Sequence, residues 1–181
     1  VVWRAEARHR LLQGKGIRVF SKPAMLKDWL QSKGVKLEDR VHLITDAGKL
    51  VDGFSLDTDG VEFFCHSPMV KHTPEGDLLR NNASLIFNVR FRVGTDHFDY
   101  LAVGDADWDV IEDIVNASKV HKNNDRLAWD IFDIPHHCSY KALNSEKGEV
   151  ETTPTKLVAE LLRAGKPGAY IVSPSHPIRD T

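Results

Sequence analysis

Two short apolar runs, each ending in potential metal ligands, constrain the fold of this chain more than any other feature. Residues 98–105 read FDYLAVGD and end at Asp105, whereas residues 129–137 read WDIFDIPHH and end at His136 and His137. A short apolar run bounded by turn residues is typical of a buried strand. Carboxylate and imidazole side chains bind catalytic metals, and a position at the end of a strand holds such ligands rigidly. The two runs therefore predict a metal-dependent enzyme built on a sheet.

The rest of the chain alternates strand and helix patterns. Strands are expected over 41–44, 49–51, 61–66, 84–91, 98–105, 129–134 and 169–173, and helices over 21–34, 107–118 and 154–165. Hairpins followed by strands that alternate with helices indicate a layered α/β fold with a largely buried sheet. We predict a single domain over 1–181, in which 1–59 is a more divergent helix-and-strand segment and 60–181 carries the motifs.

Composition narrows the function classes. The 24 Lys and Arg nearly balance the 26 Asp and Glu, so no general basic field attracts nucleic acid. No apolar run approaches the roughly 18 residues that span a bilayer, which predicts no membrane segment. Two cysteines, Cys65 and Cys138, are too few for a disulfide framework. We therefore expect a reducing, cytoplasmic location.

Asp105 taken alone is ambiguous. A carboxylate directly after the apolar Leu101–Val103 is costly to bury unpaired, so it either binds a metal or caps the helix that follows. The adjacent His136 and His137 favour the metal, because neighbours at a strand end point to opposite faces, one towards a site and one towards its support. A pair of structural histidines bound to backbone carbonyls is the alternative. The pattern does not choose which histidine is the ligand.

Four phrases, taken in order, resemble the metallo-β-lactamase fold and, more narrowly, the metallohydrolase domain of ComEC-like DNA-uptake proteins. They are NNASLIF at 81–87, LAVGDAD at 101–107, DIPHHCS at 133–139 and SPSHP at 173–177. The resemblance covers roughly the second two-thirds of the chain. It implies an αββα sandwich, here its C-terminal portion, with two divalent metal ions, zinc or manganese, along one edge of the sheets.

The resemblance also implies roles for individual residues. Asp105 would bridge the two metals, and His136 or His137 would be the last metal-binding histidine of the fold. Asn81, where many relatives have a histidine, would be a weak ligand or would hold water and substrate. The side chains expected to contact the substrate or to support the loop are those of Asn81, Ser84, Ser139 and His176. The resemblance implies that a metal-activated water hydrolyses a phosphodiester, with nucleic acid as the expected substrate.

Two departures from the family pattern bear on activity. The diagnostic phrase HxHxDH is absent, and Cys138 replaces the glycine that usually follows the histidine pair. Because the chain begins at Val1 and stops in a polar phrase, we expect it to be the C-terminal part of a longer polypeptide. Its partner would then be the N-terminal half of the same domain. Asp105 and one histidine fall short of the three protein ligands of a catalytic zinc site.

Two other functions remain open. If the HxHxDH phrase expected before Val1 has lost its metal ligands, the chain would be a catalytically incomplete structural or regulatory module. Such a module would belong to a larger assembly, for example a defence or signalling protein. The chain would be a hydrolase of small esters or lactams if the same metal site acts on those substrates, since one fold hosts several chemistries.

Overall fold

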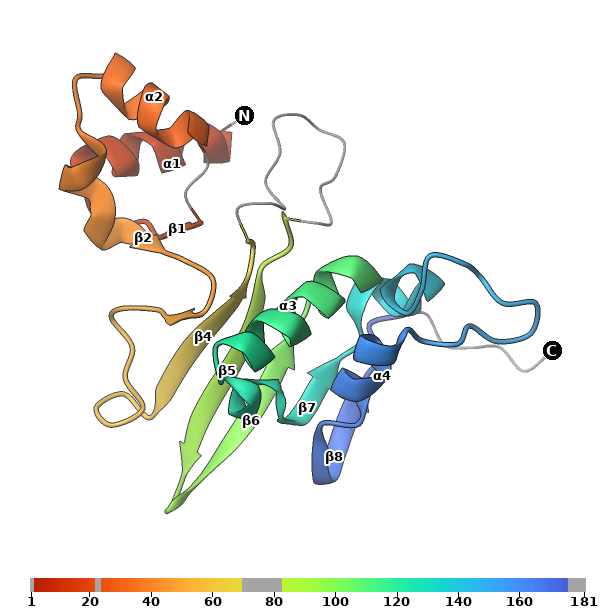
Figure 1. Cartoon of the computed structure of the whole chain (residues 1–181). Coiled ribbons are helices and arrows are strands. Elements are labelled where there is room, and N and C mark those ends of the chain that lie inside the picture. The colour runs from red at the N-terminus through yellow and green to blue at the C-terminus, as the bar shows by residue number, and fades with distance from the viewer. Residues whose placement is uncertain (1, 22–23, 70–82, 176–181) are drawn as a thin grey trace.

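A six-stranded mixed sheet organises the computed structural model, which describes residues 2–21, 24–69 and 83–175 (Figure 1). The sheet order follows the chain: β3 (Lys49–Leu50), β4 (Val61–Ser67), β5 (Ile86–Val93), β6 (Asp96–Ala102), β7 (Trp129–Asp133) and β8 (Gly165–Val172). Strands β3 to β6 pair antiparallel, whereas β6, β7 and β8 pair parallel. The change occurs where helical connections replace the hairpin, since parallel neighbours need a crossover.

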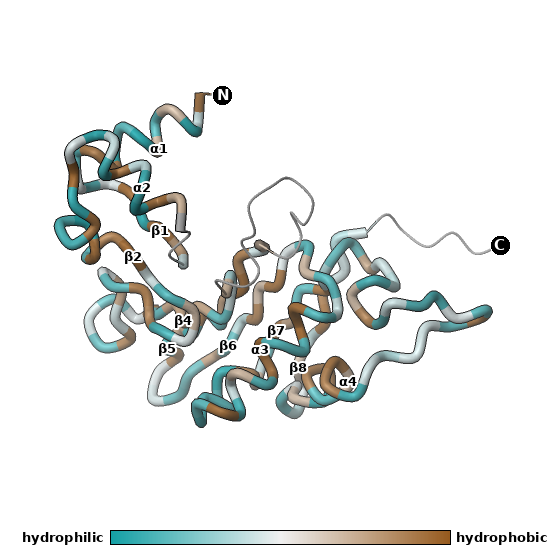
Figure 2. Tube along the Cα trace, turned by 45° about the horizontal axis from the view of Figure 1, so that its top comes forward, coloured by the Kyte–Doolittle hydropathy of each residue, from teal (hydrophilic) through white to brown (hydrophobic). Residues whose placement is uncertain are grey.

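Two helices, α3 (Trp108–Val120) and α4 (Lys156–Leu162), cover one face of this sheet (Figure 1). Both helices were predicted, α3 from its apolar spacing and α4 from Pro154 and Gly165 at its ends, and both are confirmed. Figure 2 shows the apolar positions recurring along α3. The core between the helices and the sheet consists of side chains at most 2% exposed, among them Val110, Ile111, Ile114, Val115, Val158 and Leu161 from the helices and Ile86, Leu101 and Phe132 from the strands.

The opposite face of the sheet is apolar and partly open. Strand side chains alternate between faces, so the neighbours of the core residues Leu101 and Phe132 point away from α3 and α4. On that face the exposed fraction is 71% for Tyr170, 48% for Val172 and 40% for Phe91. The prediction of a largely buried sheet therefore holds for the face under the helices and for Cys65 and Val89 on the other face, and it is wrong where Phe91, Tyr170 and Val172 are exposed.

The segment before the sheet packs partly onto this open face. Phe20 contacts Phe87 edge-on with ring centroids 5.2 Å apart, and Phe54 contacts Phe63 in the same way at 4.9 Å. These contacts cover the β4–β5 end of the face. The apolar residues near β8 lie beyond them.

The same N-terminal segment has a small core of its own. Helices α1 (Val2–Gln13) and α2 (Ala24–Ser32) and the 3-10 segment η1 (Leu37–Leu43) surround the buried Leu11, Leu30 and Leu43. Strand β1 (Val19–Phe20) pairs in parallel with β2 (Ile44–Thr45). The predicted helix ending near Gly34 is confirmed as α2.

The strand predicted over 41–44 is wrong for residues 41–43, which belong to η1. Arg40 explains the difference: its guanidinium donates to the carbonyl oxygens of Leu11 (2.7 Å) and Leu12 (2.6 Å) at the end of α1. This contact fixes the segment against the helices, and Leu43 then fills their core. Tertiary contacts thus override the local β-propensity of the apolar run.

The predicted α/β class is confirmed. Within residues 2–21, 24–69 and 83–175 one helix layer covers one large sheet, so the four-layer αββα sandwich stays a prediction. None of the helices in these ranges combines the length and apolar character that a bilayer-spanning helix requires.

Candidate functional site at the ends of strands β6 and β7

The residues predicted to carry chemistry lie on two loops that meet at one edge of the sheet. Strands β6 and β7 are parallel neighbours, with Leu101 opposite Phe132, so the loops that follow them emerge side by side. The backbone N–H of His136 donates to the carbonyl oxygen of Gly104 at 3.0 Å and ties the loops together. Ser84 lies beside Gly104, at ordinary contact distance from where a side chain there would begin.

Two carboxylate–imidazole pairs join these loops. The Oδ1 atom of Asp107 lies 2.9 Å from Nδ1 of His136, and Oδ1 of Asp105 lies 3.4 Å from Nε2 of His137. Ala106, between the two carboxylates, is fully buried and anchors the loop in the core. The Asp107–His136 pair is about a quarter exposed, whereas both members of the Asp105–His137 pair are more than half exposed.

The two histidines stand on an unusual backbone turn. Strand β7 ends at Asp133, and the 3-10 segment η6 (Pro135–Cys138) holds His136 at φ 52°, His137 at φ 50° and Cys138 at φ 64°. The left-handed conformation costs roughly 1–2 kcal/mol for each non-glycine residue, and such strain gathers at functional sites. The expected strand-like alternation of the histidines is therefore wrong, because the turn and not the pleat directs their side chains.

The conformation of Cys138 accounts for the glycine that usually stands at this place in the resembling phrase. A φ of 64° lies in the region that glycine reaches without steric cost. The Sγ atom of Cys138 lies 2.8 Å from Oγ of Ser173, in the segment after β8. The same segment reaches the site through the carbonyl of Pro174, 3.4 Å from Nδ1 of His137.

Asp105 differs from the sequence-based expectation in two respects. Its side chain is 53% exposed, so the cost of burying an unpaired charge does not apply to it. It also does not cap the next helix, because the N-cap position of α3 is Asp107. Asp107 makes no side-chain cap bond there; its carboxylate binds His136 instead. The sequence analysis missed this role, although the Asp-x-Asp spacing around Ala106 is a signal for it.

The other predicted contact residues are only partly placed. The hydroxyl oxygen of Ser139 accepts a hydrogen bond from the backbone N–H of Lys141 at 3.3 Å and so caps the short 3-10 segment η7 (Tyr140–Ala142). Asn81 and His176 lie outside the described residues. Ser84 and Ser139 thus flank the two loops, one beneath Gly104 and one at the end of the histidine turn.

Burial raises the pKa of two acidic groups near this edge of the sheet. Asp133, at the end of β7, has its pKa raised by burial, which outweighs the attraction of His137. Tyr100 on β6 likewise has its pKa raised, by burial and by the nearby Asp133. Asp133 and Tyr100 therefore lose their protons less readily than in water, and Asp105 is the exposed carboxylate beside His137.

Carboxylate and imidazole groups suit zinc or manganese, but too few of them among the described residues meet at this edge to hold either ion. Asp105 and His137 supply one carboxylate and one imidazole, whereas a catalytic zinc site takes three protein ligands. In the part of the chain that the structure describes, no three His, Cys, Asp or Glu side chains converge closely enough to hold a metal ion. These residues alone therefore do not form a complete metal site.

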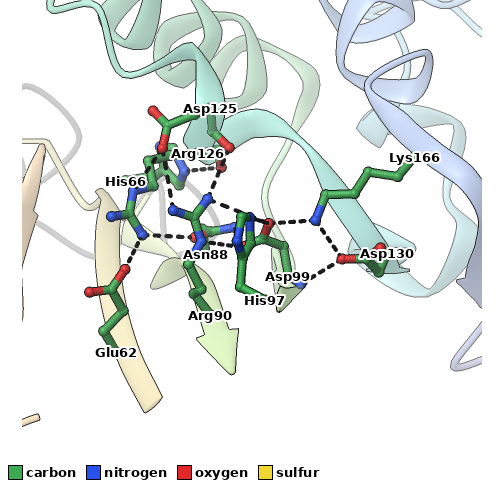
Figure 3. A network of polar contacts seen from close by, with 10 residues as sticks. All are labelled: Glu62, His66, Asn88, Arg90, His97, Asp99, Asp125, Arg126, Asp130 and Lys166. Carbon is green, nitrogen blue, oxygen red and sulfur yellow. Dashed lines mark hydrogen bonds and ion pairs between the residues drawn. The ribbon is translucent and has the colours of Figure 1, made fainter. Parts of the chain in front are cut away.

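A second polar cluster, which the sequence analysis missed, lies inside the sheet-and-helix layer (Figure 3). The carboxylate of Asp99 on β6 is fully buried and accepts hydrogen bonds from Arg90 (2.7 Å), Lys166 (2.8 Å) and Asn88 (3.2 Å). Burial raises the pKa of Asp99, but the hydrogen bonds from Arg90 and Lys166 outweigh it, and the net shift is downward. The two ion pairs of Asp99 link β6 to β5 through Arg90 and to β8 through Lys166.

His66 belongs to the same region and is a structural histidine. Its Nε2 lies 3.0 Å from the carbonyl oxygen of Arg126, and its Nδ1 lies 3.4 Å from the hydroxyl of Ser118. Burial lowers its pKa to about 4, so the ring is neutral near pH 7. Both ring nitrogens of His66 thus have partners, one on α3 and one in the segment that follows it.

Comparison of the chain with protein-family models, with curated proteins and with solved structures finds no match. The metallo-β-lactamase resemblance therefore depends on the four sequence phrases alone.

Proposed function

We propose that this chain is the C-terminal part of a metal-dependent hydrolase that acts on phosphodiesters and has a metallo-β-lactamase-like αββα sandwich. The chain would contribute the metal ligands in the loops after strands β6 and β7. The observation that carries the proposal is the pairing of Asp105 with His137 at 3.4 Å, in the loops after two parallel strands. Side chains at the carboxyl ends of neighbouring parallel strands are where open sheets usually bind ligands.

In this proposal the described residues have distinct tasks. Asp105 and His137 are exposed donors, whereas His136 is oriented by Asp107, whose carboxylate occupies its Nδ1. A carboxylate behind a histidine in this way fixes the ring and its tautomer. Two zinc or manganese ions, when bound, would supply a water of lowered pKa and would neutralise phosphate charge. The remaining donors come from outside the described residues.

The open apolar face of the sheet supports the sandwich. Tyr170, Val172 and Phe91 expose large apolar surface on the side opposite α3 and α4, and exposed patches of this kind mark contact surfaces. A second sheet from the same polypeptide, packed on this face, would complete the four layers. Nucleic acid is the first substrate to test, because the phrase order resembles that of the ComEC-like branch.

A second candidate function is that of a module without catalytic activity in a larger assembly. It is favoured by the donor count, since the described residues place two donors and not three at the strand edge. In that case the open sheet face is the functional surface, and the loop pair is a remnant of a metal site.

Metal content separates the two candidates. The protein tested is a polypeptide that joins this chain to the remaining donors; after incubation with zinc or manganese and dialysis, plasma mass spectrometry is expected to find about two ions per molecule. The ions should be lost in Asp105→Ala and kept in Asp57→Ala, a control at a fully exposed carboxylate. Hydrolysis of bis(4-nitrophenyl) phosphate should follow the metal content. Absence of bound metal in all three proteins contradicts the hydrolase and favours the module.

A further inference from the structure

A mostly apolar cavity of about 260 Å³ lies next to the candidate site, between α3, α4 and the ends of β7 and β8. Much of its wall consists of buried core side chains: Ile111, Phe132, Ala142, Val158 and Leu161. An apolar cavity of roughly 150 Å³ stays dry and takes up benzene, so a larger one has room for a substituted ring or a short alkyl chain. The described core thus leaves space for an apolar ligand.

The cavity and the candidate site share one wall, the histidine turn. Pro135, Cys138 and Ser139 line the cavity. From the same turn, His136 and His137 reach the carboxylates of the β6 loop. The cavity and the Asp105–His137 pair are therefore joined by one short backbone segment.

The chemistry of the wall restricts the occupant. Cys138 and Ser139 are the polar side chains among the residues that line the cavity. The Ser139 hydroxyl already caps η7, and Cys138 contacts Ser173. A nucleobase placed here would lose its hydrogen bonds to water without replacement, which costs several kcal/mol by transfer data. An aliphatic group or a single aromatic ring has no such cost.

We propose that this cavity is a substrate subsite for an apolar ester group of a phosphodiester whose phosphate lies at the Asp105–His137 pair. The proposal rests on the proposed function and changes its substrate class: it keeps the phosphodiester, and in place of nucleic acid it assigns a diester with an apolar alcohol component on this side of the phosphate. Hydrolysis of such a diester breaks one P–O bond and forms another from water; the alcohol leaves with the bonding electron pair and the water gives up a proton.

Binding is tested first and does not depend on activity. Cys138 is exposed, whereas Cys65 is fully buried and its pKa is raised to about 12 by burial, so iodoacetamide reports on Cys138. Saturating p-xylene is expected to slow alkylation at least about fivefold, and inorganic phosphate alone is not. The variant Ala142→Leu, which fills the cavity, should abolish the protection.

A second binding measurement uses the unaltered protein, in case Ala142→Leu does not fold. Xenon or p-xylene should shift the methyl resonances of Ile111 and Leu161, which line the cavity, and should leave those of Leu11 and Leu30 unchanged, since they belong to the N-terminal core. If neither protection nor methyl shifts are seen, the cavity binds no apolar group and the inference is overturned.

Substrate selectivity is tested with two diesters that share one leaving group. The ratio of kcat/KM for phenyl 4-nitrophenyl phosphate over methyl 4-nitrophenyl phosphate is expected to be at least about tenfold, from the burial of one ring. Ala142→Leu should bring the ratio close to one. Equal rates for both diesters keep the proposed function and overturn this inference. Ligand binding without hydrolysis of either diester contradicts the proposed function and reduces the cavity to a binding site alone.

Discussion

Removing the Asp99 carboxylate is the sharpest test of how the sheet is held together. The side chain is fully buried and directly accepts charged hydrogen bonds from Arg90 and Lys166 (Figure 3). Arg90 is only 11% exposed, so Asp99→Ala leaves a guanidinium largely out of water with its main partner gone. Breaking a buried ion pair in this way costs about 3–5 kcal/mol, a large share of the stability of an ordinary domain.

Urea unfolding at neutral pH measures the loss from the shift in midpoint at constant slope. The matched control is Asp125→Ala, whose carboxylate also lies near Arg90, at 3.5 Å, and is 61% exposed. Exposed pairs contribute at most about 1 kcal/mol, so the control should shift the midpoint little. A loss below about 1 kcal/mol in Asp99→Ala, or equal losses in the two variants, would refute the reasoning.

The same carboxylate predicts an acid dependence. Because the pKa of Asp99 is lowered in the folded state, its contribution is present above the pKa of an unfolded aspartate and is lost as the pH falls through the folded pKa. Asp99→Ala should flatten the acid limb of the stability curve. An unchanged limb would show that the charge pairs of Asp99 are not formed in solution.

Three further predictions follow from single residues. Burial lowers the pKa of His66 from 6.5 to about 4, so the folded state does not take up the proton that the unfolded state binds. The free energy of unfolding should therefore fall by about 2 kcal/mol from about pH 7.5 to about pH 5. Urea titrations at each pH measure this fall, and His66→Gln should remove it. Cys138→Gly should raise the unfolding free energy by about 0.5–1 kcal/mol by relieving the left-handed strain, whereas Ser139→Gly, at φ −68°, should lower it. Gly165→Ala should lower the melting temperature, since its Cβ would lie 2.6 Å from the Trp129 ring and overpacking costs about 1–3 kcal/mol; an unchanged melting temperature would contradict that contact.

The sequence predicted the elements near the site well, because there the local pattern and the tertiary packing agree. The apolar positions Val110 and Ile114 repeat with helical spacing and do face the sheet, as α3 requires. The run from Trp129 to Asp133 is a strand, and it delivers the histidine pair to the edge where Asp105 emerges. The prediction failed at residues 41–43, where a contact from Arg40 to the end of α1 decides the conformation.

Within the candidate site the sequence located the loops and not the partners. It identified Asp105 and the two histidines, because residue types suited to metals followed apolar runs. It left the choice between His136 and His137 open, since strand alternation sends the two side chains to opposite faces without showing which face carries the site. The structure distinguishes them: Asp107 occupies one ring nitrogen of His136, while His137 faces Asp105 in an exposed position.

The sequence by itself determined which segments are strands and helices in the motif-bearing part, because their periodicity and turn residues act over a few positions. The tertiary structure alone decided the left-handed turn at Cys138, the ion cluster around Asp99 and the cavity beside the turn. Each of these depends on groups far apart in the chain, such as Asp99 and Lys166, which lie 67 residues apart. A local pattern carries no information about such a partner, whereas the folded sheet places both groups within hydrogen-bond distance.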